Sequence, residues 1–173
     1  MTVPAADTSS STTPAAGARA EVEADVRLAF ATYREALLAG DGRTALATVT
    51  ADTVAYFADM AALGARGGPE EIAARTVGDR FFVTLVRQQV PRDALAGMSG
   101  EDLLVYGVEN GLIGAETVAE LDLGDIRVGA RSALAEVLTA GSALGARYRF
   151  LEEDGAWKVD LVDQLRGLDD ILR

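Results

Sequence analysis

The first part of the chain repeats its apolar residues three and four positions apart, which is the period of an α-helix. From Ala20 this pattern predicts a helix that Gly40 ends, and Asp41 is placed to cap a short second helix. Residues 52–57 are rich in β-branched and aromatic side chains, so they predict a first strand, with a loose stretch over 63–68 after it. The apolar stripe of the first helix consists of Val22, Val26, Ala29, Phe30, Tyr33 and Leu37.

The middle of the chain predicts further helices. Pro69 suits the first position of a helix, and the apolar repeat beyond it predicts a break at Gly78 and an end at Pro91. Ser99 begins a pattern that resembles a capping box, which predicts one more helix. We therefore expect a helical insertion around residues 69–111.

The last part of the chain alternates apolar and polar residues, which is the period of a β-strand. Turns at residues 129–130 and 153–155 predict antiparallel hairpins, and residues 164–173 resemble a short terminal helix. Helices followed by an antiparallel meander indicate an α+β domain, with helices packed on one face of a curved sheet. The predicted strands cover residues 126–128, 132–138, 144–150 and 157–162.

The first residues differ in composition from the rest. Ser, Thr, Ala and Pro dominate residues 1–18, and such a segment buries too little apolar surface to offset its ordering entropy. We therefore expect a disordered tail before a single domain over residues 19–173. The tail lacks the basic and apolar regions of a secretory signal, and no stretch is long and apolar enough to span a bilayer. The expected location is cytoplasmic.

The amino-acid composition excludes several kinds of catalytic and metal-binding site. The 173 residues include no cysteine and no histidine, and their formal net charge is −11. There is thus no thiolate nucleophile, no zinc knuckle and no Ser-His-Asp triad, and we expect neither a metal nor another cofactor. The negative charge opposes binding to nucleic acid and to anionic membranes, so neither is expected as a partner. Any acid–base chemistry must use Asp, Glu, Tyr, Arg or the backbone.

Two segments carry a resemblance to a known family. One is the end of the first helix, Tyr33-Arg-Glu-Ala-Leu-Leu-Ala-Gly-Asp41, and the other is Tyr148-Arg-Phe150 with Asp154-Gly-Ala-Trp-Lys-Val159. In these segments the chain resembles the nuclear transport factor 2-like superfamily, which includes SnoaL-like polyketide cyclases, ketosteroid isomerase and limonene epoxide hydrolase. The resemblance covers about residues 20–60 and 121–163.

The resemblance implies a cone, formed by the curved sheet and the N-terminal helices, that encloses a pocket for a hydrophobic small molecule. It also implies a homodimer formed through the outer face of the sheet. Two alternatives for the function stay open, because one fold hosts many functions. One is a cofactor-independent SnoaL-like enzyme that cyclises, isomerises or opens an epoxide. The other is a non-catalytic module for ligand binding or dimeric assembly.

The catalytic residues of ketosteroid isomerase are matched only in part. The resemblance aligns Tyr33 with the tyrosine that hydrogen-bonds the developing oxyanion in that enzyme. It aligns Phe57 with the proton-moving aspartate and Ala146 with the aspartate beside the oxyanion. Two of the three groups are therefore replaced, and steroid-type isomerisation is not expected.

Asp160 is the first candidate for acid–base chemistry. It interrupts an otherwise apolar strand, so its carboxylate must be paired, solvated or lining a cavity. An ion pair with Arg147 or Arg149 on the preceding strand is the favoured structural interpretation. If Asp160 instead faces an apolar pocket, desolvation would raise its pKa and fit it for proton transfer near neutral pH.

Three other residues complete the candidate catalytic set. Asp59 is the alternative proton-transfer group, and Tyr33 or Tyr56 would donate the hydrogen bond. Tyr56 and Asp59 lie at or just after the predicted strand. In an ideal strand they would point to opposite faces, and both would line one pocket only if the strand ends or bends between them. The structural alternatives are that Tyr33 and Tyr56 pack in the core and that Asp59 caps a turn.

The candidate substrate-binding residues are of two kinds. Arg80 and Arg87 lie seven residues apart, about two helical turns, so one helix face would present both to an anionic group. The alternative is that this pair forms the solvated side of an amphipathic helix. Apolar contacts to the ligand are expected from Phe57, Tyr106 and Trp157.

Overall fold

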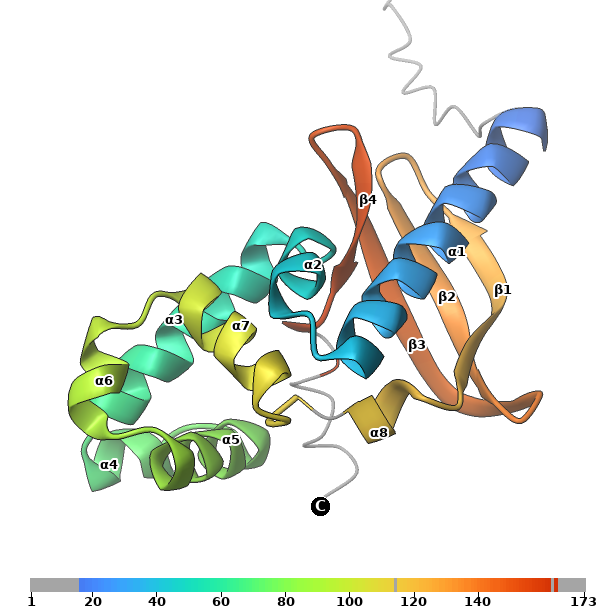
Figure 1. Ribbon diagram of the computed structural model, residues 1–173. Helices are drawn as coiled ribbons and strands as arrows, with labels where there is room; N and C mark the ends of the chain where they lie inside the picture. Colours follow the sequence, from blue (N-terminus) through green and yellow to red (C-terminus); the bar gives the residue numbers. More distant parts are fainter. Residues whose placement is uncertain (1–15, 114, 163, 165–173) are drawn as a thin grey trace, which may run out of the picture.

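The fold places a helical part before an antiparallel sheet, in a computed structural model that describes residues 16–113, 115–162 and 164 (Figure 1). The α+β class predicted from the sequence is confirmed. The described helices are α1 (Ala16–Ala39), α2 (Gly42–Ala47), α3 (Ala51–Arg66), α4 (Pro69–Ala73), α5 (Val77–Gln89), α6 (Arg92–Gly97), α7 (Gly100–Glu109) and α8 (Ala115–Val118). The described strands are β1 (Leu121–Val128), β2 (Ser132–Thr139), β3 (Ser142–Glu153) and β4 (Ala156–Asp160).

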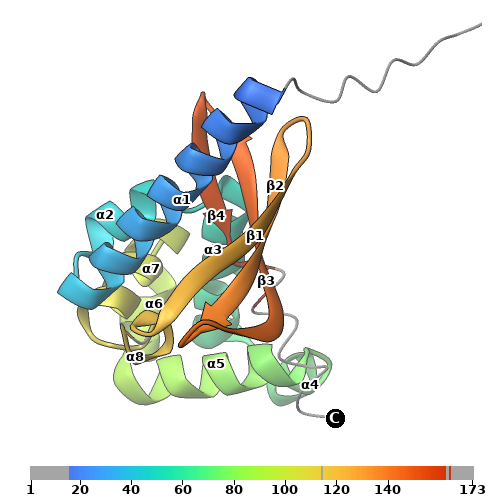
Figure 2. The same cartoon turned by 90° about the vertical axis from the view of Figure 1, so that its right-hand side faces the viewer.

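The strands form one sheet in the order β1-β2-β3-β4, and every neighbouring pair is antiparallel. Helix α1 runs along one face of the sheet, whereas α3 to α7 gather beyond the β4 side (Figures 1 and 2). Helix α8 connects this helical group to β1. The chain therefore forms a sheet half and a helical half, joined along β4.

The core of the sheet half lies between α1 and the inner face of the sheet. On β3 this face carries Tyr148 and Phe150, and the Phe30 ring of α1 lies 5.3 Å from the Tyr148 ring, centroid to centroid. On β2 the same face carries Ala133 and Ala135, whose small side chains leave room for the helix. The buried face of β2 and β3 is thus built from alternate residues of each strand.

The two halves are joined by hydrogen bonds between the start of α3 and β4. The backbone N–H of Val159 donates to the carbonyl of Thr48 at 2.8 Å, and the N–H of Thr50 donates to the carbonyl of Val159 at 3.1 Å. Next to this joint the Leu161 N–H donates to the buried hydroxyl of Thr53 at 3.0 Å. These bonds fix the first turn of α3 against the end of β4.

The strand predicted over residues 52–57 is wrong, because these residues belong to α3. Thr50 caps this helix, since its hydroxyl accepts the N–H of Thr53 at 3.3 Å. The buried residues of α3 recur at helical spacing, and packing of that stripe outweighs the strand preference of the β-branched and aromatic side chains. The loose stretch predicted over residues 63–68 is also wrong, because α3 continues to Arg66.

Several predicted helix boundaries are confirmed. Asp41 caps α2, Pro69 begins α4, and Ser99 and Asp102 form the capping box of α7. The predicted break between two helices is present, but it lies at residues 74–76 and not at Gly78, because α4 ends at Ala73 and α5 begins at Val77.

The ends of the chain are described only in part. Helix α1 begins at Ala16, earlier than the predicted Ala20. Residues 1–15 of the predicted tail and most of the predicted terminal helix, residues 163 and 165–173, lie outside the described residues. No helix in the described part of the chain is long and apolar enough to cross a membrane.

Candidate functional site

An apolar cavity of about 430 Å³ lies where the helical half meets the sheet. Its described lining is dominated by aromatic and aliphatic side chains from α1, α3, α5, α8, β1 and β3, together with residues just before α8 and just after β4. Volume and lining are those of a site for an apolar small molecule. The lining includes Tyr33, Tyr56, Phe57, Phe81, Phe82, Leu85, Ile113, Val118, Leu121, Tyr148 and Leu161.

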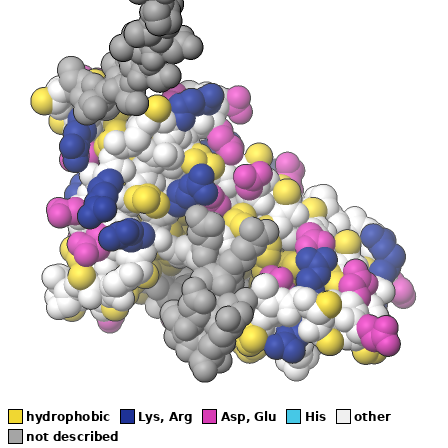
Figure 3. Space-filling model, turned by 180° about the vertical axis from the view of Figure 1, so that it is seen from behind, with side chains coloured by type: hydrophobic (Ala, Val, Ile, Leu, Met, Phe, Trp, Pro, Cys, Tyr) yellow, Lys and Arg dark blue, Asp and Glu magenta, His cyan; other side chains and the backbone are white. Residues whose placement is uncertain are grey.

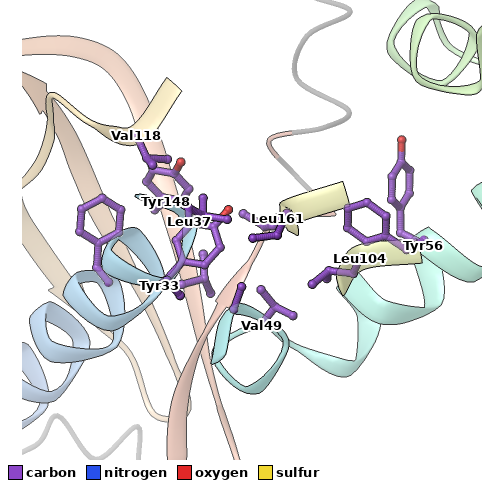
Figure 4. Close-up of a cluster of buried hydrophobic side chains, with 14 of the residues drawn as sticks. Tyr33, Leu37, Val49, Tyr56, Leu104, Val118, Tyr148 and Leu161 are labelled. Atoms are coloured by element: carbon purple, nitrogen blue, oxygen red, sulfur yellow. The ribbon is translucent and has the colours of Figure 1, made fainter. Parts of the chain in front are cut away.

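Two tyrosines from facing elements contribute phenol hydroxyls to the wall of this cavity. Tyr33 of α1 and Tyr148 of β3 are 3% and 5% exposed, and their rings lie close together below Val118 (Figure 4). Among the described residues neither phenol hydroxyl has a hydrogen-bond partner. Two hydroxyl donors at an apolar cavity wall can hold one acceptor oxygen of a ligand.

The raised pKa values of these two phenols make them hydrogen-bond donors rather than bases. Burial raises the pKa of Tyr148 to about 12. Burial and, to a smaller extent, the neighbouring Tyr148 raise the pKa of Tyr33 well above its ordinary value of 10.0. Both hydroxyls therefore keep their protons throughout the neutral range.

Tyr56 also lines the cavity, but its hydroxyl is directed elsewhere. It donates to Oδ1 of the buried Asp79 at 2.8 Å, and in Figure 4 it lies apart from the hydroxyls of Tyr33 and Tyr148. Asp79 is held in turn by the cap of α5, where its N–H donates to the Thr76 hydroxyl at 3.1 Å. The pair ties α3 to α5 behind the cavity wall.

A second hollow, the polar cleft, brings three predicted catalytic residues together. Asp59, Tyr56 and Asp160 line this cleft of about 390 Å³, together with Asp52 and Arg149. The strand that would have separated Tyr56 from Asp59 is not formed, because both residues lie on α3. On α3 they are three positions apart, so they share one face. Tyr33 lines the apolar cavity instead.

Asp160 is buried in the wall of the polar cleft and is ion-paired. It is 3% exposed, and its Oδ2 lies 3.7 Å from Nη1 of Arg149, one of the two partners predicted. Its Oδ1 accepts the N–H of Val162 at 3.1 Å. The carboxylate is thereby compensated, which agrees with the structural interpretation made from the sequence.

Asp59, the other proton-transfer candidate, is engaged with a guanidinium. Its two carboxylate oxygens accept from Nη1 and Nη2 of Arg75 at 2.7 and 3.1 Å. The hydrogen bond that Arg75 donates to Asp59 is the main reason why the pKa of Arg75 is raised. This bidentate pair joins α3 to the residues before α5, so its first role is structural.

The two predicted anion-binding arginines do not reach either hollow. Arg87 donates from Nε to the Gly64 carbonyl at 2.8 Å and from Nη2 to the carbonyls of Leu63 and Gly67 at 3.1 and 2.7 Å. It thus closes the end of α3, and partial burial lowers its pKa. Arg80 is exposed and lines neither the apolar cavity nor the polar cleft.

The predicted aromatic contacts are divided among three places. Phe57 lines the apolar cavity. Tyr106 packs against the core from α7, its hydroxyl 3.4 Å from the carbonyl of Gln89, and it lines neither hollow. Trp157 lines a separate groove of about 330 Å³ with residues of α1 and α2.

Sequence reasoning missed Tyr148 and Asp79. Tyr148 alternates with exposed arginines on β3, so its inward direction was readable, but its position opposite Tyr33 depends on how α1 packs on the sheet. Asp79 looked like an ordinary acidic residue in the first turn of a helix. Its partner Tyr56 lies on a segment that was predicted as a strand, so nothing in the local sequence indicated that the two side chains meet.

The described residues contain no cluster of His, Cys, Asp or Glu able to hold a metal ion. The sequence and the fold were also compared with family models, curated proteins and solved structures, and none of them matches this chain.

Proposed function

We propose that this protein binds a mostly apolar small molecule in the cavity and holds one acceptor oxygen of that ligand between the hydroxyls of Tyr33 and Tyr148. The observation that carries the proposal is a pair of buried phenol donors without described partners on a mostly apolar wall. A ketone or another neutral oxygen acceptor fits these donors, since no described lining residue carries a charged side chain.

The non-catalytic alternative is favoured at this cavity. Both tyrosines stay protonated near neutral pH, so they donate hydrogen bonds and remove no proton from a ligand. The carboxylates nominated as proton-transfer groups, Asp59 and Asp160, line the polar cleft instead. The sequence resemblance implies a cone of the nuclear transport factor 2-like type. To hold a ligand in such a cone, the protein needs no catalytic group besides these hydrogen-bond donors.

Binding of the naphthyl ketone dye prodan tests this proposal. Its ring system suits an apolar cavity, its ketone accepts hydrogen bonds, and its fluorescence responds to both. We expect Tyr33→Phe and Tyr148→Phe each to weaken binding about tenfold, which corresponds to one lost hydrogen bond of about 1.4 kcal/mol.

Tyr106→Phe is the matched control, because that phenol lies outside the cavity lining. Its prodan affinity should equal that of the wild type. The proposal is wrong if prodan does not bind, or if all three variants bind it as tightly as the wild type.

A second candidate function, an epoxide-opening enzyme, is supported by the polar cleft. The cleft is lined by three aspartates and an arginine, Asp52, Asp59, Asp160 and Arg149. The resemblance to limonene epoxide hydrolase implies an Asp-Arg-Asp set, and these are residues of the same types. In such a reaction a carboxylate takes a proton from water and the water oxygen bonds to the epoxide carbon, while the bond between that carbon and the ring oxygen breaks. The alkoxide then takes up the proton that the carboxylate removed, which restores the carboxylate.

Hydrolysis of styrene oxide tests this second candidate. Asp160→Asn should abolish diol formation, whereas Asp52→Asn, on the rim of the same cleft, should leave it unchanged. Absence of diol formation by the wild-type protein, or full activity of a folded Asp160→Asn variant, excludes this assignment.

A further inference from the structure

One aromatic side chain of the apolar cavity is exposed to solvent. Phe81 of α5 lines the cavity, yet it is 66% exposed. Tyr33 and Tyr148 line the same cavity from α1 and β3, and they are 3% and 5% exposed. A side chain that lines a cavity and is also open to solvent lies where that cavity opens. Phe81 therefore lies at the mouth of the cavity, and the two phenols lie at its closed wall.

Helix α5 turns one apolar face toward the cavity. The cavity-lining residues of α5 have the spacing of a single helical face, and they are Gly78, Phe81, Phe82 and Leu85. The Phe82 ring lies 5.6 Å from the Phe57 ring of α3, centroid to centroid, which anchors this face on α3. In Figures 1 and 2, α5 lies apart from α1 and β3, the elements that carry the two phenols. The mouth and the phenols are thus contributed by different sides of the cavity.

The exposure of Phe81 is unlike that of the other exposed apolar side chains. Figure 3, which views the molecule from behind, shows charged side chains of both signs spread over the described surface, with hydrophobic side chains between them. Among the described residues, the exposed large hydrophobic side chains are Leu28, Leu38, Phe81, Leu134 and Leu144. Of these, Phe81 is the one that lines the apolar cavity. A ligand in the cavity would therefore cover Phe81 and none of the others.

We propose that the ligand lies with its acceptor oxygen inward, at Tyr33 and Tyr148, and with its opposite end against Phe81 at the mouth. This inference rests on the proposed function and adds the chemical class of the ligand. That class is an elongated apolar molecule with a carbonyl near one end, whose other end extends toward solvent. The reverse direction would place the oxygen against the apolar face of α5 and leave both buried phenol donors unpaired.

A second copy of this chain fits the exposed Phe81 less well than a ligand does. The exposed residues of α5 around Phe81 are polar, namely Arg80, Thr84 and Gln88. One phenylalanine among polar residues supplies far less apolar area than the roughly 800 Å² that each partner buries in a stable interface.

Two isomers of prodan test the direction of the ligand. One has a hexanoyl group in place of the propionyl group, so it is longer at the ketone end. The other has an N-butyl-N-methylamino group in place of the dimethylamino group, so it is longer at the amino end. Because the two dyes are isomers, their hydrophobicity is similar. We expect the amino-extended isomer to bind at least about tenfold tighter, since only its added carbons point to the open mouth.

Thiol protection places the ligand at the mouth directly. The chain has no cysteine, so Phe81→Cys introduces a single thiol there. A saturating concentration of the amino-extended isomer should slow alkylation of this thiol by iodoacetamide about fivefold, because the bound dye covers most of it.

Leu28→Cys is the matched control. Leu28 is also 66% exposed, but it lies on α1 outside the lining of the apolar cavity. The dye should leave the alkylation rate of this variant unchanged. Circular dichroism confirms that each variant is folded.

Three results would overturn the inference. One is equal or tighter binding of the ketone-extended isomer. Another is an alkylation rate of Phe81→Cys that the dye does not change, or that it lowers only as much as in Leu28→Cys. The third is a dimer in mass measurements that Phe81→Ser dissociates, because a second copy would then cover this side chain.

These results separate the inference from the proposed function. If prodan binds and Tyr33→Phe and Tyr148→Phe weaken its binding, each of the three results overturns the direction of the ligand and leaves the proposed function intact. If neither prodan nor either isomer binds, the proposed function and this inference are both wrong.

Discussion

At the scale of single residues, the ionisation of the two cavity tyrosines makes the free energy of unfolding depend on pH. The pKa of Tyr148 is raised to about 12 in the folded chain, and that of Tyr33 is raised further. The unfolded chain loses these protons near pH 10, so above that pH it binds fewer protons than the folded chain does. The free energy of unfolding should therefore be constant with respect to these groups below about pH 10 and fall as the pH rises through about 12.

Urea unfolding at about pH 8 and about pH 11 measures this effect. The wild type should lose stability between the two conditions, and Tyr148→Phe should lose less, because one of the raised groups is absent. Equal losses in the two proteins would show that Tyr148 titrates normally.

The buried threonine hydroxyls at the joint between α3 and β4 make a second residue-scale prediction. Thr53→Val keeps the shape of the side chain but removes the acceptor of the Leu161 N–H and the partner of the Thr50 hydroxyl. We expect a loss of about 2 kcal/mol in the free energy of unfolding, because a buried N–H is left without a partner.

Thr84→Val is the control for this threonine, since Thr84 is exposed and bonds only within its own helix. It should change the free energy of unfolding by less than about 0.5 kcal/mol. Similar effects of the two substitutions would mean that the joint is not held by the buried hydroxyl.

At the scale of elements, the packing of α7 on α3 depends on a glycine. A Cβ added at Gly100 would overlap the backbone carbonyl oxygen of Val54 and lie 2.8 Å from the N of Ala58. Gly100→Ala should thus push the helices apart and cost about 2–3 kcal/mol in the free energy of unfolding.

Gly97 provides the comparison, because a Cβ there meets nothing within 4 Å. Gly97→Ala should be neutral or slightly stabilising in thermal unfolding. If Gly100→Ala is equally harmless, α3 and α7 do not pack as closely as described.

The elements also show which parts of the fold could be predicted. Helix ends with side-chain caps, such as Asp41 and Ser99, and strands with alternating burial were predictable because the signal is local. Residues 52–57 were not, since strand preference and helical packing compete there and the deciding contacts come from distant parts of the chain. The hydrogen bond between Tyr56 and Asp79 could not be predicted for the same reason, because Tyr56 lies on the helix that the sequence indicated as a strand.

At the scale of the whole molecule, the joint along β4 separates two hollows of different chemistry. Tyr56 contributes to both, while Tyr33 and Tyr148 belong to the apolar cavity and Asp160 to the polar cleft. The residue types of the candidate site were predictable from the sequence, but their division between two hollows was not, because it depends on how the helical half meets the sheet.

The central claim is that the hydroxyls of Tyr33 and Tyr148 hold an oxygen of the bound ligand. Infrared spectroscopy of bound prodan, isotopically labelled at its ketone, measures this contact directly through the carbonyl stretch. We predict a frequency well below that of prodan in hydrocarbon solvent, and a partial return toward the hydrocarbon value in both Tyr33→Phe and Tyr148→Phe. A carbonyl frequency equal to that in hydrocarbon, or one unchanged by either substitution, would contradict the claim.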